Sequence, residues 1–460
     1  MSSYETFSDQ RRTLIFINIL ITCIASSLLA TALTTALPPI IEEFQISMAT
    51  GQWLTSAYSM AMGIIMPLTA FLITRFPTKK LYLTGVICFT VGLCISAIAS
   101  SFSFMMGGRI LQACGNGILT SMAQVILLTI YPAKQQGSIM GWYGLAVGAT
   151  PVIAPTLAGI LIDYFSWRMI FYISIVIMLF SFIFALFVFD DFLDTTVKKF
   201  DILSFILSAF AFGGITLGIG NISSYGFAIN ATLPLLIGLI TAVLFVYRQF
   251  HQETAFLELR ILKYKNYTLS VIGSMLLYFI MMGASILMPL YIQSIMGYSA
   301  TICGLVLLPG SLLMAFISPF AGKIYDKFGM KLLFTVGAIC LLFGNLGMVF
   351  VTMETTLLLP TIYNAIRNIA IGCLLMPLVT WGIGNIKRDA TAHGTALLNS
   401  LRTIAGAIGS AVSVGVMTMV ASRLTTSPAI LQGLHISFLM LTLFTGILLL
   451  MAIFCVHSER

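Results

Sequence analysis

Residues 137–172 read GSIMGWYGLAVGATPVIAPTLAGILIDYFSWRMIFY. The stretch is apolar and long enough to cross a bilayer, turn and start back. Two of its glycines stand four residues apart on one helix face, so a second helix can approach backbone to backbone, and each of its prolines bends the helix. We therefore expect a kinked, glycine-lined transmembrane helix against which a neighbour pivots. The residues expected to shape this pivot are Gly144, Gly148, Pro151, Pro155 and Gly159.

The same stretch resembles the antiporter motif of drug exporters in the major facilitator superfamily. That motif pairs glycines around a proline and ends in WR.iF. Here residues 148–159 read GATPVIAPTLAG, with alanine in place of the first glycine of each pair, and residues 167–171 read WRMIF. Close packing of two ordinary membrane helices remains the simpler alternative for the glycines alone.

Composition indicates an integral membrane protein. The chain has 460 residues, of which 59% are hydrophobic and only 8% are charged, whereas soluble domains have about 25% charged residues. Fourteen apolar runs of spanning length predict an all-α membrane protein with fourteen transmembrane helices. The eight cysteines show no CxxC or Cys/His cluster, so we expect neither a disulfide framework nor a metal site.

The distribution of positive charge predicts the orientation of these helices. With the N-terminus inside, most lysines and arginines fall in the cytoplasmic segments, as positive-inside topology requires. This pattern predicts a multi-pass membrane protein with both termini in the cytoplasm, and the resemblance to drug exporters implies a bacterial plasma membrane. The charge pattern also accounts for the net charge of +8 without a nucleic-acid partner.

Three landmarks recur at an interval of roughly 250 residues, as in an internal repeat. Pro38 corresponds to Pro289, residues 74–80 to residues 326–331, and Arg109 to Arg367. The repeat predicts a 6+2+6 arrangement of helices, and the resemblance implies a major facilitator fold. The arrangement consists of an N-terminal six-helix bundle (1–200), two inserted helices with a cytoplasmic connector (201–267) and a C-terminal six-helix bundle (268–460). We expect the connector segment 248–267 to be amphipathic and to lie on the membrane; a plain loop is the alternative.

Residues 322–331, GKIYDKFGMK, resemble the short cytoplasmic signature G…D..G..K of this superfamily. Gly329 permits a tight turn. Asp326 can accept hydrogen bonds from a helix N-terminus or pair with a basic neighbour, holding two helices in one conformer. The first-half copy has Thr74 in place of the acid and Pro77 in place of the glycine, which weakens any latch there. A solvated positive-inside turn is the alternative for both copies.

Residues 107–117, GGRILQACGNG, resemble the arginine motif of the fourth helix in the same family. Arg109 and Asn116 are seven residues apart and share a helix face. A charge held inside the membrane costs about 3 kcal/mol on insertion scales, so Arg109 should face a wet cavity or a partner. The hypothesis is that it tunes proton coupling; the alternative is that it snorkels to the interface. Arg367 and Arg402 are further arginines within spans.

The first span resembles the D.T..N.ALP.I signature of fourteen-span drug exporters, but Leu29 and Thr34 replace its acid and asparagine. Burial can raise the pKa of a membrane carboxyl toward neutrality, which makes it the usual proton carrier. No carboxyl lies near mid-depth in any predicted span. The remaining candidates for proton coupling, beside Arg109, lie near outer ends and could equally be solvated loop charges: Asp163, Glu42 and Glu43.

Aromatic and methionine side chains are abundant, and they suit flat lipophilic cations and walls that repack around different shapes. Any one of them could instead be packing or lipid contact. The candidate substrate contacts are Gln52, Trp53, Tyr58, Met62, Asn116, Tyr278, Met282, Gln293, Asn364, Asn368 and Trp381.

Together these motifs resemble the fourteen-span drug:proton antiporters of the major facilitator superfamily, similar to bacterial quaternary-ammonium and lincomycin exporters. The resemblance implies efflux of amphipathic, often cationic drugs by a monomer that alternates access, with the proton gradient as energy source and no cofactor. An exporter or flippase of a lipid, metabolite or peptide, without protons, is the alternative. An enzyme is not indicated, because no HExxH, GxSxG or Walker pattern occurs.

Overall fold

The computed structural model describes residues 8–193, 195–196, 200–226, 228–252, 255–423 and 429–456. Within its helices it does not describe the side chains of residues 30, 31, 48, 49, 52, 151, 152, 155, 156, 163, 223–225 and 300. Every regular element in the described residues is helical, so the predicted all-α fold is confirmed.

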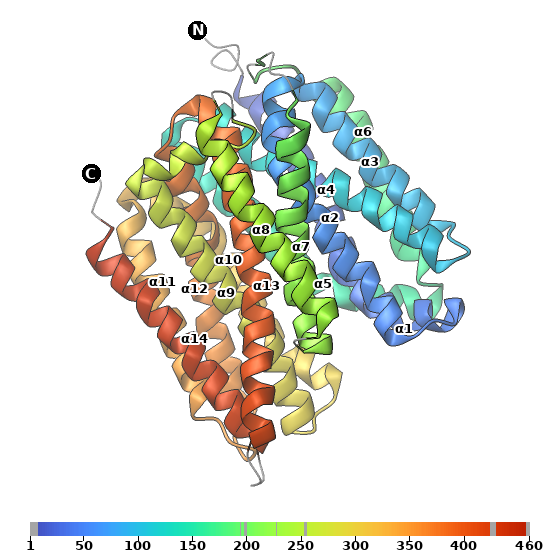
Figure 1. Cartoon of the computed structure of the whole chain (residues 1–460), viewed down its shortest axis with the longest axis vertical. Helices are drawn as coiled ribbons and strands as arrows, with labels where there is room; N and C mark the ends of the chain where they lie inside the picture. Colours follow the sequence, from blue (N-terminus) through green and yellow to red (C-terminus); the bar gives the residue numbers. More distant parts are fainter. Residues whose placement is uncertain are drawn as a thin grey trace.

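The first half of the chain forms six long helices (Figure 1). They are α1 (Asp9–Phe44), α2 (Met48–Arg75), α3 (Thr78–Ala97), α4 (Phe102–Ile130), α5 (Ala133–Tyr164) and α6 (Arg168–Val188). The second half repeats this number with α9 (Lys265–Pro289), α10 (Ala300–Phe328), α11 (Met330–Val349), α12 (Leu358–Gly384), α13 (Thr391–Arg423) and α14 (Ala429–Phe454). A π-helical turn (Leu290–Ile295) extends α9, and a 3-10 turn (Arg388–Ala390) precedes α13.

Two further helices, α7 (Ile202–Tyr225) and α8 (Ile229–His251), stand between the halves in the sequence. Thirteen of the fourteen long helices in the described residues contain a window apolar enough to cross a membrane. The exception is α5, several of whose side chains are not described. The predicted number of spans is therefore consistent with the structure.

Short polar caps set where several helices begin. Side chains of four serines and one aspartate accept the amide hydrogen three residues further on, which pairs one of the free donors at a helix start. These caps are Ser8, Ser47, Ser101, Asp201 and Ser299. The apolar runs between them need no other signal to be helical, because a membrane interior leaves no partner for backbone groups outside a helix.

The two halves meet mainly along two helix pairs, α5 with α10 and α2 with α13, with further contacts of α12 with α5 and of α13 with α4. We call this contact the seam. We call the end of the bundle where α2, α10 and α12 finish the basic end, because the helix ends there carry residues such as Arg75, Lys80 and Lys331; it is uppermost in Figure 1. The inserted helix α7 contacts both α2 and α13, so the inserted pair covers one side of the seam.

The connector after α8 is a loop with one 3-10 turn (Leu259–Lys263). Its Phe256, Leu257 and Ile261 side chains are buried against the protein. The connector is therefore a loop packed on the protein, and its contact with the membrane surface stays a prediction. The apolar residues that gave the segment its amphipathic pattern pack into the fold instead of facing lipid.

Candidate functional site

Helix α5 packs closely against α10 of the other half, from the basic end to about its middle. A Cβ added to Gly141 would lie 2.6 Å from the Ser318 carbonyl oxygen, and one on Gly148 would lie 2.7 Å from Met314 Cε. A Cβ on Gly144 would collide with Ser318 and Met376. Gly159, further along, has no atom within 4 Å of such a position among the described residues. The glycines therefore allow a close helix contact between the halves that ends before Gly159.

Asp326 joins the two halves at the basic end. Its carboxylate, near the end of α10, accepts the Gly137 amide hydrogen at Oδ1 and the Ser138 amide hydrogen at Oδ2, both at 2.7 Å, near the start of α5. Gly329 follows with φ +73°, in the left-handed region that favours glycine. In the first-half copy, the Thr74 hydroxyl donates to its own helix at Ala70 O (3.1 Å). Only the second copy therefore makes an acid–helix contact across the seam.

A cavity of about 520 Å³ lies at the basic end beside Thr74, in the first-half copy of the cytoplasmic signature. Both halves, the α6–α7 loop and the connector line it, with Thr74, Thr196, Glu258 and Asp389 among its residues. His393 is buried there at the start of α13, and its Nδ1 accepts the Glu258 amide hydrogen at 3.3 Å. This hydrogen bond connects the connector to α13, one of the helices that form the seam.

Polar side chains also meet across the middle of the seam. Asn399 Nδ2 on α13 donates to Gln124 Oε1 on α4 at 3.0 Å, and both side chains are fully buried. Several polar atoms on the same two helix faces are buried without a hydrogen-bond partner in the described part of the chain. They are Ser121 Oγ, Gln124 Nε2, Thr395 Oγ1, Asn399 Oδ1 and Arg402 Nη1. Each unpaired buried group costs about 1–3 kcal/mol, so water or a ligand that reached these atoms would stabilise this surface.

Arg109 is 1% exposed, so it is buried and does not snorkel. Its Nε donates to Leu54 O at 3.2 Å, its Nη1 donates to Gln112 Oε1 at 2.7 Å, and its guanidinium lies 4.2 Å from the centroid of the Tyr58 ring. Asn116 Nδ2 donates to the Tyr58 hydroxyl at 2.7 Å and lies 3.7 Å from Met62 Sδ. Four predicted site residues thus gather within the first half, on α2 and α4.

Arg367 forms the corresponding cluster in the second half, with weaker pairing. Its Nη2 donates to Asn364 Oδ1 at 2.8 Å, and Asn368 Nδ2 donates to the same oxygen at 3.0 Å. Arg367 Nε and Nη1 are buried without a partner among the described residues. The cluster lies within one half, because a Cβ on Gly344 of α11 would touch Arg367.

Tyr278 and Met282 are the predicted residues that reach α13. The Arg402 guanidinium lies 4.8 Å from the centroid of the Tyr278 ring, and Met282 packs beside Gly406. Both contacts join α9 to α13 within the second half.

The other predicted residues are not part of these clusters. Glu43 pairs with Arg168 at 2.7 Å and accepts the Trp167 indole hydrogen at 2.7 Å, and such an ion pair favours the ionised carboxylate. Trp381 packs on Phe334 inside the second half. Glu42 and Gln293 are exposed, and Trp53 is half-buried. The predictions for Gln52, Pro151, Pro155 and Asp163 concern side chains outside those described.

The family model described as Major Facilitator Superfamily matches residues 15–410. This chain belongs to the major facilitator superfamily. Among its relatives, the uncharacterized MFS-type transporter YcnB of Bacillus subtilis is 34% identical over 413 residues, covering 89% of this chain and 88% of YcnB. The lincomycin resistance protein LmrB of the same bacterium is 33% identical over 395 residues, covering 84% of this chain and 81% of LmrB.

The fold of this major facilitator also resembles solved structures. The proton:xylose symporter XylE superposes with a TM-score of 0.67 at 12% identity, covering 96% of this chain and 97% of that one. As a member of this family the chain is a membrane transporter, with drug-resistance proteins among its relatives. Its duplicated halves and central seam have the general geometry that alternating access requires.

Proposed function

We propose that this protein exports amphipathic small molecules from the cytoplasm by alternating access. The observation that carries the proposal is the polar seam around Gln124 and Asn399. A contact meant to stay closed would pair its buried polar atoms, whereas one that opens in each cycle must leave groups for water and substrate.

Export of drugs is supported by relatives named for lincomycin and multidrug resistance. Proton antiport is the proposed energy source. Asp163 and Glu42 are the candidate coupling acids, because Glu43 is held by Arg168. Arg109 would act on coupling through its buried charge.

A second candidate is an exporter or flippase of a metabolite, lipid or peptide without proton coupling. One observation favours it: the buried charged residues in the described part of the chain include arginines but neither aspartate nor glutamate. A proton carrier within the membrane would need such an acid.

Everted membrane vesicles test these two functions. With an imposed proton gradient, adding lincomycin or a rhodamine dye should release protons, detected with a pH-sensitive dye. Uptake of those compounds without proton release would favour the second candidate. Neither uptake nor proton release with any amphipathic compound would contradict export altogether.

A further inference from the structure

The charged side chains buried in the described part of this transporter are all positive. Arg109, Arg367 and Arg402 are exposed by only 1%, 5% and 7%, and no carboxylate is buried among the residues that the structure describes. Each ion pair found there lies among partly exposed side chains, and none includes these arginines. A guanidinium stays protonated in proteins, so the described interior carries positive charge without a negative partner.

Two of the three arginines are held within one half of the molecule. Arg109 bonds Leu54 and Gln112 of the first half, and Arg367 bonds Asn364 of the second half. Their contacts position helices within a bundle and would move with it as a unit.

Arg402 differs because it lies at the seam. It follows Asn399 by three residues on α13, so it shares the helix face that bonds Gln124 of the first half. Its Nη1 is buried without a partner among the described residues, and its guanidinium faces the Tyr278 ring at 4.8 Å. A cation with free donor capacity and one aromatic ring therefore lie on the α13 face that meets the first half.

We propose that Arg402 binds an anionic group of the substrate, a carboxylate, sulfonate or phosphate on an aromatic or amphipathic body. The guanidinium fork would take the anion by charge-assisted hydrogen bonds, and Tyr278 would contact the flat body. This inference rests on the proposed export function and departs from the expectation of cationic drugs, because a plain cation at this place would be repelled.

The test uses proteoliposomes of the full chain and two dyes that differ in one group, rhodamine B with a free carboxylate and its ethyl ester. The wild type should transport rhodamine B in preference to the ester. Arg402→Gln should lower rhodamine B transport roughly tenfold to a hundredfold, the range for a lost charged hydrogen bond, and leave the ester unchanged. Arg402→Lys should keep part of the preference. Arg423→Gln, an exposed arginine on the same helix, is the matched control and should behave as wild type.

Each outcome separates this inference from export itself. Transport of the ester alone, or equal loss of both dyes in Arg402→Gln, would overturn the anion site and leave export standing. Transport of neither dye would contradict export. The anion site would then be tested by fluorescence measurement of rhodamine B binding to the purified proteins, where Arg402→Gln should bind more weakly than the wild type. Equal binding by both proteins would overturn the anion site. A free inorganic anion is the other source of the same chemistry. Ester transport that rises with chloride in wild type but not in Arg402→Gln would assign the site to that ion and overturn a substrate anion.

Discussion

Single side chains hold the two halves of this protein together at a few points. Asp326 contributes a carboxylate to two amide hydrogens near the start of α5, where the partial positive charge of a helix N-terminus favours an anion. Asn399 and Gln124 add one neutral bond deeper in the seam. Because these contacts are few and local, changing one of them should shift the balance between closed and open forms without unfolding either half.

Asp326→Asn should open the basic end. The loss of charge at a helix start costs about 1–2 kcal/mol, which is roughly a tenfold shift in a two-state population. Ser121→Cys, placed in a chain without its native cysteines, reports opening because Ser121 is buried in the seam. A membrane-impermeant maleimide should label it faster in Asp326→Asn. Lys327→Gln, which alters the neighbouring charge that lies over Phe328, should leave the labelling rate unchanged. Equal rates in all three proteins would show that Asp326 is no latch.

Asp201 gives a prediction for pH. Burial would raise the pKa of its carboxyl, but the hydrogen bonds from Ser204 and Arg248 outweigh burial and hold that pKa below its usual range. A depressed pKa stabilises the fold above the unfolded value, about 3.9, and the stabilisation is lost as pH falls through the folded value. Asp201→Asn should therefore lower the melting temperature by the same amount from pH 8 to pH 5, and by less below pH 4. Asp9→Asn, fully exposed, should lower it little at any pH. A difference that grows on acidification would contradict the pairing.

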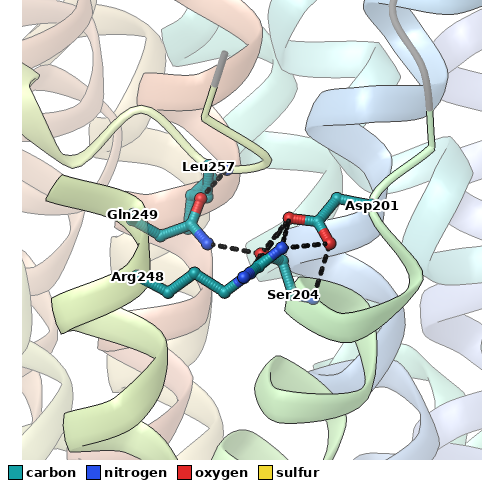
Figure 2. A network of polar contacts seen from close by, with 5 residues as sticks. All are labelled: Asp201, Ser204, Arg248, Gln249 and Leu257. Carbon is teal, nitrogen blue, oxygen red and sulfur yellow. Dashed lines mark hydrogen bonds and ion pairs between the residues drawn. The ribbon is translucent and has the colours of Figure 1, made fainter. Parts of the chain in front are cut away.

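At the level of the helices, hydrogen bonds connect the inserted pair, α7 and α8, to the start of α13. Figure 2 shows Arg248 and Gln249 of α8 reaching the Asp201 and Ser204 side chains at the start of α7. Gln249 Oε1 also accepts the Leu257 amide hydrogen at 3.1 Å, and the next residue bonds His393. The inserted helices are thus connected through the loop to the start of α13, so they can steady that helix as the halves move.

Gln249→Ala should loosen this connection. It removes the side-chain acceptor of the Leu257 amide and one of the hydrogen bonds of Ser204, at a cost of about 1–3 kcal/mol. Hydrogen–deuterium exchange in residues 255–263 should become faster. Asn221→Ala, which removes a bond to Asn230 O at the other end of the inserted pair, should leave exchange there unchanged. Unchanged exchange in Gln249→Ala would mean that other contacts hold the loop.

The α5–α10 contact makes a prediction for glycines. A Cβ on Gly322 would collide with the Gly137 backbone, which cannot move aside as a side chain can. Gly322→Ala should therefore force the helices apart at the basic end, at about 1–3 kcal/mol, and reduce transport. Gly159→Ala has free space and should transport normally. If both variants transport equally, close contact of these helices is not needed for the cycle.

At the level of the whole molecule, the sequence predicted the number of helices, the two-half repeat and the glycine-lined face of α5. These rest on hydropathy and spacing, which are local properties. The partner of that face, α10, could not be predicted, because the choice depends on how the two halves assemble. Asn399, Ser121 and Thr395 were missed for the same reason: an isolated polar residue in an apolar helix carries no sign of what it faces. The connector was ambiguous because its apolar residues suit a membrane surface and a protein surface equally.

The central claim is that the two halves separate at the basic end and close again during transport. Spin labels at Lys80 on α3 and Lys331 on α11, one in each half, measure that separation directly in lipid nanodiscs. Two distance populations are predicted, with the longer one enriched by Asp326→Asn and altered by a transported dye. A single distance distribution that neither the variant nor any transported compound changes would contradict the account.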